Sequence, residues 1–565
     1  MSRASRSLSN MSRIAPRSAR ALWPTSANAP MLGRVLGSAA GGALLAAAFP
    51  PHDIVWLAPP ALALLTLSWR GVRTWPGFWL GLLTGFAFLL PHILWMRVIG
   101  DDAWILLSAL FAPAFALIGA GVAWTSRLKY WVLAVPLLWV TSEAIRDREP
   151  FGGFPWGRLA FSQTNTSLTP YAAIAGAPGV TFALAAMGSL LAFVVVSLRR
   201  PRAVVAALIG IAIIGSAGGL VPLPTQGQVD LGAHGGPATV VAAVVQGNVP
   251  AAGLDAFGER AAVLLNHVHE TEKLAADVAA GIARQPDLVI WPENSTDIDP
   301  LLDAAAASQI QHAADAINVP ILVGAVVNVP SDPSHIWNTG IVWLPTSSGT
   351  PGPSTNYVKQ HPVPFGEWIP ARAVLSALIP RFGRIPRDFA AGPSTGVLQV
   401  GPARLGDLIC FEVAYDSLAT AAVRGDGVPG ALAGLGARII TVQTNNATYG
   451  HTGQPEQQLA MSRLRAVEHG RAVLIAATSG ISAIIAPDGS MVGLLGEYTA
   501  GYLVESVPLR DELTISDRLG AVPELVAVLA SIALLFLAYR GRRRDEHVGS
   551  ATDDGLAIST GEAAL

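Results

Sequence analysis

The stretch Arg404-Leu-Gly-Asp-Leu-Ile-Cys410-Phe-Glu412 contains the only cysteine of the 565-residue chain. An apolar pair leads into the thiol and an acidic residue follows two positions later. This pattern predicts a strand that ends in a tight turn and displays the cysteine at its tip. A lone cysteine is more often a small buried hydrophobic residue, and this stretch alone leaves that alternative open. A nucleophilic role for Cys410 would need a base and a cation from elsewhere in the chain.

The composition divides the chain into a membrane part and a globular part. The sequence is 51% hydrophobic and only 13% charged, whereas soluble domains have about a quarter charged residues. Residues 31–221 are almost free of acids, and residues 238–510 resemble an ordinary soluble domain. The net charge of −2 gives no indication of a nucleic-acid partner. One cysteine excludes an intramolecular disulfide, and no Cys/His cluster has the spacing of zinc ligands.

Apolar segments predict eight membrane helices, because a helix needs about 20 apolar residues to cross the hydrocarbon core. The segments are residues 33–49, 54–69, 76–97, 103–124, 130–146, 170–198, 203–222 and 520–539. The first could be mistaken for a signal peptide, but further apolar segments follow at once. We therefore expect it to be a retained helix.

Basic residues cluster in alternate loops of this eight-helix arrangement. The clusters are the N-terminal tail, Arg70 with Arg73, Arg127 with Lys129, residues 199–202 and residues 540–544. The positive-inside rule then places both termini in the cytoplasm and residues 223–519 on the other side of the membrane. The expected organisation is a disordered basic tail (1–30), a seven-helix membrane domain (31–222), an extracytoplasmic domain (223–515), an eighth membrane helix (516–540) and a cytoplasmic tail (541–565).

An aromatic, glycine-rich loop on the predicted outer side runs from Phe151 to Arg158 and contains Trp156. One interpretation is an aromatic belt at the membrane interface with arginines that extend to water. The other is a site for a lipid headgroup or an acyl chain.

Short apolar strands alternate with helices from residue 238 onward. Strands are predicted over 238–246, 287–291, 321–326, 336–344, 395–400, 405–409, 438–443, 473–478 and 482–485, and helices over 256–284, 300–317, 413–423 and 455–470. Continuous apolar strands between helices indicate layered α/β packing around buried sheets.

Three residues could act together, although each has an ordinary alternative. Glu293 follows the strand 287–291 and could simply be a helix N-terminal acid, and Lys359 could be a solvated loop residue. Acyl transfer by Cys410 needs a base, since a free thiol has a pKa of about 8.5. Glu293 could remove that proton, and Lys359 could stabilise an oxyanion together with the backbone N–H of Phe411. Composition does not show that the three side chains converge.

The order and contexts of Glu293, Lys359 and Cys410 resemble the Glu-Lys-Cys triad of the nitrilase (carbon–nitrogen hydrolase) superfamily, whose fold is an αββα sandwich. With its membrane part, the chain is similar to the apolipoprotein N-acyltransferases, a membrane-embedded family of that superfamily. The motifs that carry this resemblance are Val245-Gln-Gly-Asn-Val-Pro250, Trp291-Pro-Glu293, Lys359-Gln-His-Pro-Val-Pro-Phe-Gly-Glu367, Ile409-Cys-Phe-Glu412, Arg463-Leu-Arg-Ala-Val-Glu-His-Gly-Arg471, Thr478-Ser-Gly-Ile-Ser-Ala483 and Gly153-Phe-Pro-Trp156.

The resemblance implies an enzyme of the bacterial cell membrane that works through a thioester. Cys410 would take an acyl chain from a membrane phospholipid. The α-amino group of the lipidated N-terminal cysteine of a diacyl apolipoprotein would then accept that chain. Glu293 would be the base and Lys359 the cation beside the oxyanion, with Glu367 and Glu412 in support. The resemblance implies no metal and no cofactor, and we expect a monomer.

Four more residues are predicted to contact substrates: Asn446, Tyr449, Trp156 and Trp368. The apolar loop 362–386, which contains Trp368, is predicted to be a membrane-facing lid, with a loop buried against the sandwich as the alternative. Two other functions stay open. A membrane-tethered amidase of the same superfamily would not need eight membrane helices, and a non-catalytic scaffold would not need all three triad residues.

Overall fold

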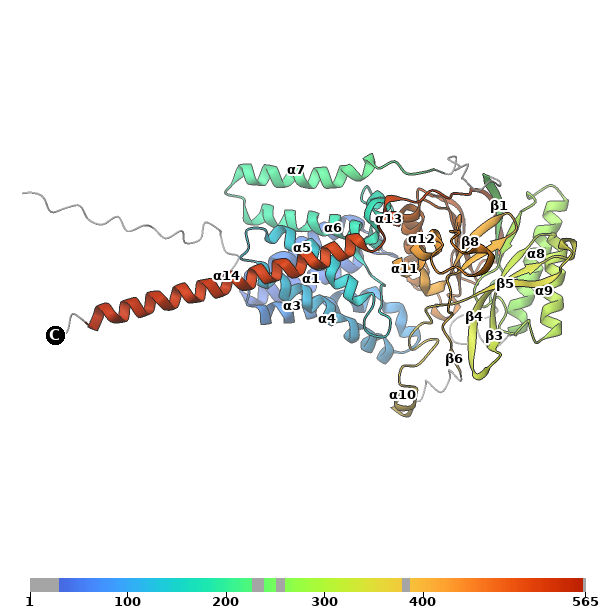
Figure 1. The fold of residues 1–565 in the computed structure, drawn as a ribbon, viewed down its shortest axis with the longest axis horizontal. Helices are drawn as coiled ribbons and strands as arrows, with labels where there is room; N and C mark the ends of the chain where they lie inside the picture. The colour runs from blue at the N-terminus through green and yellow to red at the C-terminus, as the bar shows by residue number, and fades with distance from the viewer. Residues whose placement is uncertain (1–29, 226–237, 250–259, 379–386, 562–565) are drawn as a thin grey trace, which may run out of the picture.

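The computed structural model describes residues 30–225, 238–249, 260–378 and 387–561. Figure 1 shows a bundle of helices at one end of the molecule and a two-sheet sandwich at the other. The predicted basic tail lies outside the described residues except for Pro30.

Helices occur at all eight positions predicted for membrane segments. They are α1 (Met31–Ala47), α2 (Ala58–Trp69), α3 (Thr74–His92), α4 (Asp101–Thr125), α5 (Trp131–Arg146), α6 (Ala172–Val196), α7 (Pro201–Ala217) and α14 (Val522–Gly561). Within the described residues, five of these helices are long and apolar enough to cross a membrane, namely α3, α4, α6, α7 and α14. Helices α1, α2 and α5 are shorter. Helix α14 continues past the predicted boundary at residue 540, and the part of it that could cross a membrane lies within Val522–Arg544.

Small residues allow the helices of the bundle to pack closely. Gly77, Gly81 and Gly85 recur every fourth residue along α3 and face α4. A Cβ atom on Gly81 would lie 2.4 Å from the carbonyl oxygen of Phe115, so only glycine fits this contact. Such small-residue stripes replace the hydrophobic effect as the source of helix association inside a lipid environment.

Alternate loops of the bundle meet the sandwich. The Gln457 side-chain amide, in the sandwich, donates hydrogen bonds to the carbonyl oxygens of Pro50 and His92, at the ends of α1 and α3. Tyr415 donates to the carbonyl oxygen of Gly152, in the loop after α5. The loops that carry the basic residues follow α2, α4 and α6. They therefore lie at the end of the bundle remote from the sandwich, as does the C-terminal end of α14 (Figure 1).

Two sheets form the globular part. The first has the strand order β13-β1-β2-β3-β4-β5, with β6 beside β4, and the second has the order β12-β11-β10-β9-β8-β7. The strands of the first sheet are β1 (Thr239–Gln246), β2 (Leu288–Ile290), β3 (Ile321–Val329), β4 (Asp332–Leu344), β5 (Gly352–Val358), β6 (Asp388–Phe389) and β13 (Gly501–Pro508). Those of the second sheet are β7 (Val397–Val400), β8 (Ala403–Ile409), β9 (Ile439–Thr444), β10 (Val473–Ala477), β11 (Ser482–Ile485) and β12 (Met491–Leu495). The central strands β1–β3 and β8–β10 are parallel.

Helices cover the outer face of each sheet, which confirms the αββα sandwich. Helices α8 (Arg260–Ala279) and α9 (Ala304–Ile317) pack on the first sheet, and a hydrophobic core fills the space between the two sheets. Helices α11 (Asp416–Arg424) and α12 (Gln454–His469) lie between the second sheet and the bundle (Figure 1). One core cluster runs from the second sheet through Leu464 of α12 to Val180 of α6. The sandwich and the bundle therefore share a hydrophobic core.

The predicted strands correspond to β1–β4 and β7–β11, and the predicted helices to α8, α9, α11 and α12, whereas β5, β6, β12 and β13 were missed. Three of the missed strands are at the edges of the sheets. Strands β5, β12 and β13 each end a sheet, and most of their residues are exposed or half-buried. An edge strand needs no continuous apolar run, because one or both of its faces meet water. The short helices α10 (Arg372–Leu378) and α13 (Ile515–Leu519) were also missed.

Gly324 tests how closely the chain packs in the first sheet. A Cβ atom at this position of β3 would lie 2.1 Å from the Pro292 carbonyl oxygen and 2.8 Å from the Glu293 Cα atom. We expect Gly324→Ala to lower the free energy of unfolding of the purified protein by about 1–3 kcal/mol, because the backbone must move to admit the methyl group. Denaturant unfolding in detergent would measure the change.

Gly219→Ala is the matched control, since no atom lies within 4 Å of a Cβ placed there. Equal stabilities of the two variants would contradict the close packing of β3 against the segment after β2.

Candidate active site

The single cysteine lies at the sharp turn predicted from its sequence. Strand β8 ends at Ile409, and Cys410 begins the 3₁₀ turn Cys410–Ala414 with a φ of 56°. A non-glycine residue in this left-handed region costs about 1–3 kcal/mol and persists only where its surroundings hold it. The Gln458 side chain donates to the Cys410 carbonyl oxygen at 3.0 Å, and the Thr444 hydroxyl contacts the Cys410 Sγ atom at 3.4 Å. The strained backbone presents the thiol at the end of the strand.

Lys359 lies between two carboxylates. It follows the last residue of β5, and its side chain is only 1% exposed. The Lys359 Nζ atom is 3.1 Å from Glu293 Oε1 and 2.8 Å from Glu367 Oε1. Lysine has three N–H donors. Two of them go to these oxygens, and within the described residues no third acceptor is present.

Hydrogen bonds from neutral groups fix both carboxylates. The Asn338 side-chain amide donates to Glu293 Oε1 at 2.7 Å and to Glu367 Oε1 at 3.0 Å. The second oxygen of Glu293 accepts from the backbone N–H of Asn445 at 2.8 Å, and that of Glu367 accepts from the N–H of Val363 at 2.6 Å. Sequence reasoning missed Asn338. Its signal was a polar residue inside the otherwise apolar strand 336–344.

Electrostatics keep the lysine charged. Burial alone lowers the pKa of Lys359, but the carboxylates of Glu293 and Glu367 outweigh it and hold that pKa well above its usual value. The ammonium group is therefore a fixed positive charge on a buried side chain.

The thiol is kept protonated by the same surroundings. Burial and the negative charge of Glu293 raise the pKa of Cys410 to about 12, although Lys359 and Thr444 act in the opposite direction. At neutral pH the resting group is a thiol, so a base must take its proton during the reaction. Glu293 is hydrogen-bonded to Lys359, and the charges of both act on Cys410, so the three residues of the predicted triad lie near one another.

Glu412 joins the two segments that carry Lys359 and Cys410. One of its carboxylate oxygens accepts from the backbone N–H groups of Gln360 at 2.7 Å and His361 at 3.0 Å. The other accepts from the N–H of Ile409 at 2.7 Å. The Tyr357 hydroxyl donates to the same carboxylate, at 2.9 Å from its nearer oxygen. Burial raises the pKa of Glu412, against the effect of Lys359 and these donors. Its position indicates a structural link between two loops.

Aromatic side chains line the seam between the site and the bundle. The Phe411 ring stacks on Trp156 at 6.0 Å, with 13° between the ring planes. Trp156 is buried and donates to the side chain of Gln457 at 2.6 Å. Tyr449 packs edge-on against Trp95 at 4.9 Å. Burial raises the pKa of Tyr449, and the neighbouring Cys410 and Glu293 act in the same direction.

The other two residues predicted to contact substrates lie in different surroundings. Asn446 is buried, and its amide donates to Gln454 at 2.6 Å and to Gln458 at 2.8 Å, the residue that holds the Cys410 carbonyl. Trp368 is half-buried and donates to the carbonyl oxygen of Pro362. Residues 379–386 of the predicted lid, which include Ile379 and Phe382, lie outside the described residues.

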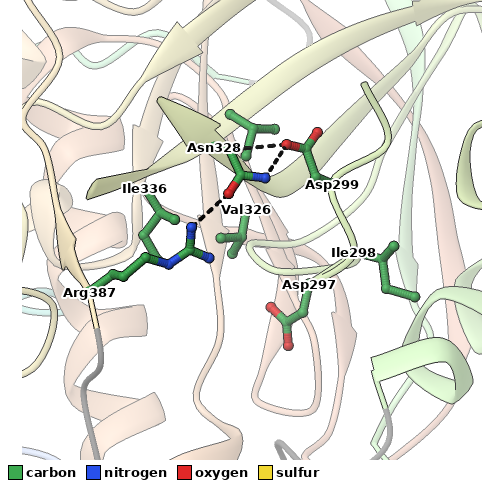
Figure 2. A pocket seen from close by; sticks show the side chains of 8 residues that line it. Asp297, Ile298, Asp299, Val326, Asn328, Ile336 and Arg387 are labelled. Carbon is green, nitrogen blue, oxygen red and sulfur yellow. Dashed lines mark hydrogen bonds between the residues drawn. The ribbon is translucent and has the colours of Figure 1, made fainter. Parts of the chain in front are cut away.

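A separate cavity of about 250 Å³ opens beside β3 and β4. Figure 2 shows that Asp299 and Arg387 both bind the side chain of Asn328 there, so these polar groups are paired with one another. None of the predicted site residues lines this cavity.

Comparison with known proteins covers both parts of the chain. Residues 41–190 match the apolipoprotein N-acyltransferase N-terminal domain, and residues 241–512 match the carbon–nitrogen hydrolase family. An amidase from Nesterenkonia sp. is a similar solved structure, with 20% identity, a TM-score of 0.34, and coverage of 53% of this chain and 98% of that chain.

Two relatives match nearly the whole chain. An apolipoprotein N-acyltransferase of Mycolicibacterium smegmatis is 40% identical over 528 residues, which covers 89% of this chain and 85% of the relative. That of Azotobacter vinelandii is 30% identical over 532 residues, which covers 89% of this chain and 94% of the relative. Since the match runs through the helical bundle and the sandwich alike, the chain belongs to the apolipoprotein N-acyltransferase family.

Proposed function

We propose that the protein transfers an acyl chain from a membrane phospholipid to the α-amino group of the lipidated N-terminal cysteine of diacyl apolipoproteins. The observation that carries this proposal is the buried Glu293–Lys359–Glu367 cluster around the single thiol. The cluster lies in a sandwich that shares its core with a bundle of apolar helices, so lipid substrates can reach it from the membrane.

In the first half-reaction, Glu293 takes the proton of the Cys410 thiol as its sulfur attacks an ester carbonyl of the phospholipid. The carbonyl oxygen becomes an oxyanion, which the free N–H of Lys359 and the backbone N–H of Phe411 stabilise. When the tetrahedral intermediate collapses, the C–O bond breaks. Glu293 returns the proton to the leaving alkoxide, which departs as lysophospholipid, and the acyl chain remains on sulfur as a thioester.

In the second half-reaction, the neutral α-amino group of the apolipoprotein attacks the thioester carbonyl. A C–N bond forms, Glu293 accepts a proton from the nitrogen, and the same donors stabilise the second oxyanion. The C–S bond then breaks, and the thiolate regains its proton from Glu293. The products are the free thiol and an N-acylated apolipoprotein, so the enzyme returns to its starting state.

The two further acids have positioning roles in this proposal. Glu367 holds the ammonium group of Lys359 and is itself held by Asn338. Glu412 fixes the backbone on both sides of the site, because it binds the N–H groups of Gln360 and Ile409.

Phe411, Trp156, Tyr449 and Trp368 are proposed to contact acyl chains. Phe411 and Trp156 stack on each other at the seam, and Tyr449 lies beside the thiol. Asn446 is proposed to position the Cys410 turn, because it binds Gln458, which in turn binds the Cys410 carbonyl oxygen. Asn446 is also proposed to contact the acceptor peptide directly.

We also propose eight membrane crossings, with both termini in the cytoplasm and the sandwich on the extracytoplasmic face of a bacterial cell membrane. Basic residues at the bundle end remote from the sandwich support this orientation. The proposed domains are 31–222 for the first seven helices, 223–515 for the catalytic part and 516–540 for the eighth helix, with tails on either side. A monomer is part of the same proposal.

The proposal is tested by incubating the purified protein with phospholipid and measuring the mass of the peptide that contains Cys410. We expect an added acyl mass that is lost when a diacylated lipopeptide is supplied, with the acyl chain recovered on its amino group. Cys410→Ser should give no stable thioester. The proposal would be overturned if the wild-type protein formed no adduct with phospholipid. It would also be overturned if a small amide, and not the phospholipid, acylated Cys410.

Glu293→Gln should separate the acidity of the thiol from catalysis. The Glu293 charge raises the pKa of Cys410, so its removal lowers that pKa and more thiolate is present at a given pH. We expect faster alkylation of Cys410 by iodoacetamide at pH 8 than in the wild type, but acyl transfer about 10²–10⁴-fold slower, because the base is lost. Both rates are measured on the same preparation.

Glu524→Gln is the control for loss of a carboxylate, since Glu524 pairs with Arg148 on the bundle. Alkylation of Glu293→Gln that is slower than that of the wild type would contradict the electrostatic account of the thiol.

Trp368→Ala should impair lipid transfer without loss of thiol reactivity. Its indole lies in the apolar loop and binds only the Pro362 carbonyl among the described groups. We expect thioester formation from phospholipid to fall by about 10-fold, because an aromatic side chain buries much apolar area against an acyl chain. Iodoacetamide should alkylate Cys410 at the wild-type rate. Equal losses of both reactions would show that Trp368 supports the site structurally and contradict the proposed lipid contact.

A further inference from the structure

Arg158 is a buried arginine between three carboxylates at the seam of the molecule. It follows the aromatic loop after α5, and its side chain is 4% exposed. Its guanidinium nitrogens lie 3.6 Å from Glu143 Oε2, 3.2 Å from Asp147 Oδ2 and 2.7 Å from Asp416 Oδ2. Glu143 and Asp147 belong to the end of α5, whereas Asp416 begins α11 of the sandwich. Arg158 therefore forms an ionic link between the bundle and the sandwich.

The partner of Arg158 in the sandwich is itself paired with a second arginine. Asp416 Oδ1 lies 2.7 Å from the Nη2 atom of Arg465, whose side chain is fully buried in α12. Arg465 donates from Nε to the Val413 carbonyl oxygen at 2.8 Å and from Nη2 to the Ala414 carbonyl oxygen at 2.9 Å. Val413 and Ala414 are the last two residues of the turn that begins at Cys410. The ionic link thus extends to the nucleophile turn.

The membrane end of this link is equally well fixed. Glu143 accepts a hydrogen bond from the backbone N–H of Leu159 at 2.8 Å and another from the Thr181 hydroxyl of α6 at 2.8 Å. Since this carboxylate is tied to two elements of the bundle and pairs with Arg158, it holds Arg158 in place if Asp416 shifts with the sandwich. Any displacement of the Cys410 turn relative to the bundle must break a buried, charge-assisted contact.

We infer that Arg158 is a positioning residue, which holds the Cys410 turn in register with the bundle through Asp416 and Arg465. This inference rests on the proposed acyl transfer. The turn contains the strained nucleophile and the backbone N–H of Phe411. A small shift of the turn therefore moves both the attacking sulfur and one of the oxyanion donors away from the reacting carbonyl. In the proposed function the bundle orients the lipid substrates and the sandwich orients the thiol, so a buried ionic contact between the two parts affects the rate of the chemical step.

The test compares single-turnover thioester formation in Arg158→Gln, Arg158→Lys and wild-type protein over a range of phospholipid concentrations. Each preparation is normalised by the amount of Cys410 that iodoacetamide can alkylate under denaturing conditions, and its thermal unfolding in detergent is recorded. We expect the maximal rate of Arg158→Gln to fall by about 10-fold or more, because misplacement of about 1 Å can cost up to about 10²-fold. The half-saturating phospholipid concentration should change by less than about 2-fold.

Arg158→Lys should recover part of the rate, because it keeps the charge but lacks the planar fork that reaches several carboxylates. Arg148→Gln is the matched control. Arg148 lies near the same end of α5, but it pairs with Glu524 of α14 and has no contact with the Cys410 turn in the described structure. The control should retain the wild-type rate.

A merely structural role would lower the unfolding temperature or the yield of Arg158→Gln and leave the rate of each folded molecule unchanged. Such a result, or an equal effect in Arg148→Gln, would overturn the inference.

If Arg158→Gln does not accumulate as folded protein, Asp416→Asn breaks the same link and leaves no acid unpaired. A wild-type maximal rate in folded Asp416→Asn would then overturn it. Failure of the wild-type protein to form any thioester would instead overturn the proposed function, and the inference with it.

Discussion

The ammonium group of Lys359, held between Glu293 and Glu367 inside the sandwich, is the interaction on which the rest of the site depends. A buried charge is costly unless opposite charges and hydrogen bonds surround it. The two carboxylates provide the opposite charge. Asn338 donates to the same two oxygens that bind Lys359, and two backbone N–H groups satisfy the remaining oxygens. The result is a fixed positive charge beside a thiol that burial and Glu293 keep protonated. In the proposed mechanism, such a site keeps its nucleophile protonated until a carbonyl arrives for the base and cation to act on.

The two-sheet fold explains why these groups can meet. Cys410 comes from the end of β8 in the second sheet, whereas Glu293 and Lys359 follow β2 and β5 of the first. Packing of the two sheets face to face brings these ends together, and Glu412 ties the Lys359 loop to the end of β8. The site is therefore a property of the sheet–sheet interface, and the helical layer of α11 and α12 connects it to the bundle.

Sequence reasoning identified the parts of the molecule that local pattern determines. Apolar runs gave the central strands and the positions of the bundle helices, because a buried strand or a membrane helix needs continuous apolar residues. The turn at Cys410 and the grouping of Glu293, Lys359 and Cys410 were also predictable, the latter from motifs, whereas their catalytic roles stay a prediction. Edge strands such as β5 were not, since their exposed residues have no such pattern. Asn338 and the Arg158–Asp416 pair escaped notice for another reason. Their roles depend on contacts between residues far apart in the chain, which no local pattern encodes.

The state of the Cys410 proton tests this account most directly. Because the chain has one cysteine, its S–H stretching vibration can be observed without interference by infrared difference spectroscopy against Cys410→Ala. The account predicts that the resting wild-type protein keeps the S–H band from pH 7 to about pH 10, since the pKa of Cys410 is raised to about 12. Loss of the band at neutral pH would show a resting thiolate. It would contradict the account, in which Glu293 takes the proton only as sulfur attacks the acyl carbonyl.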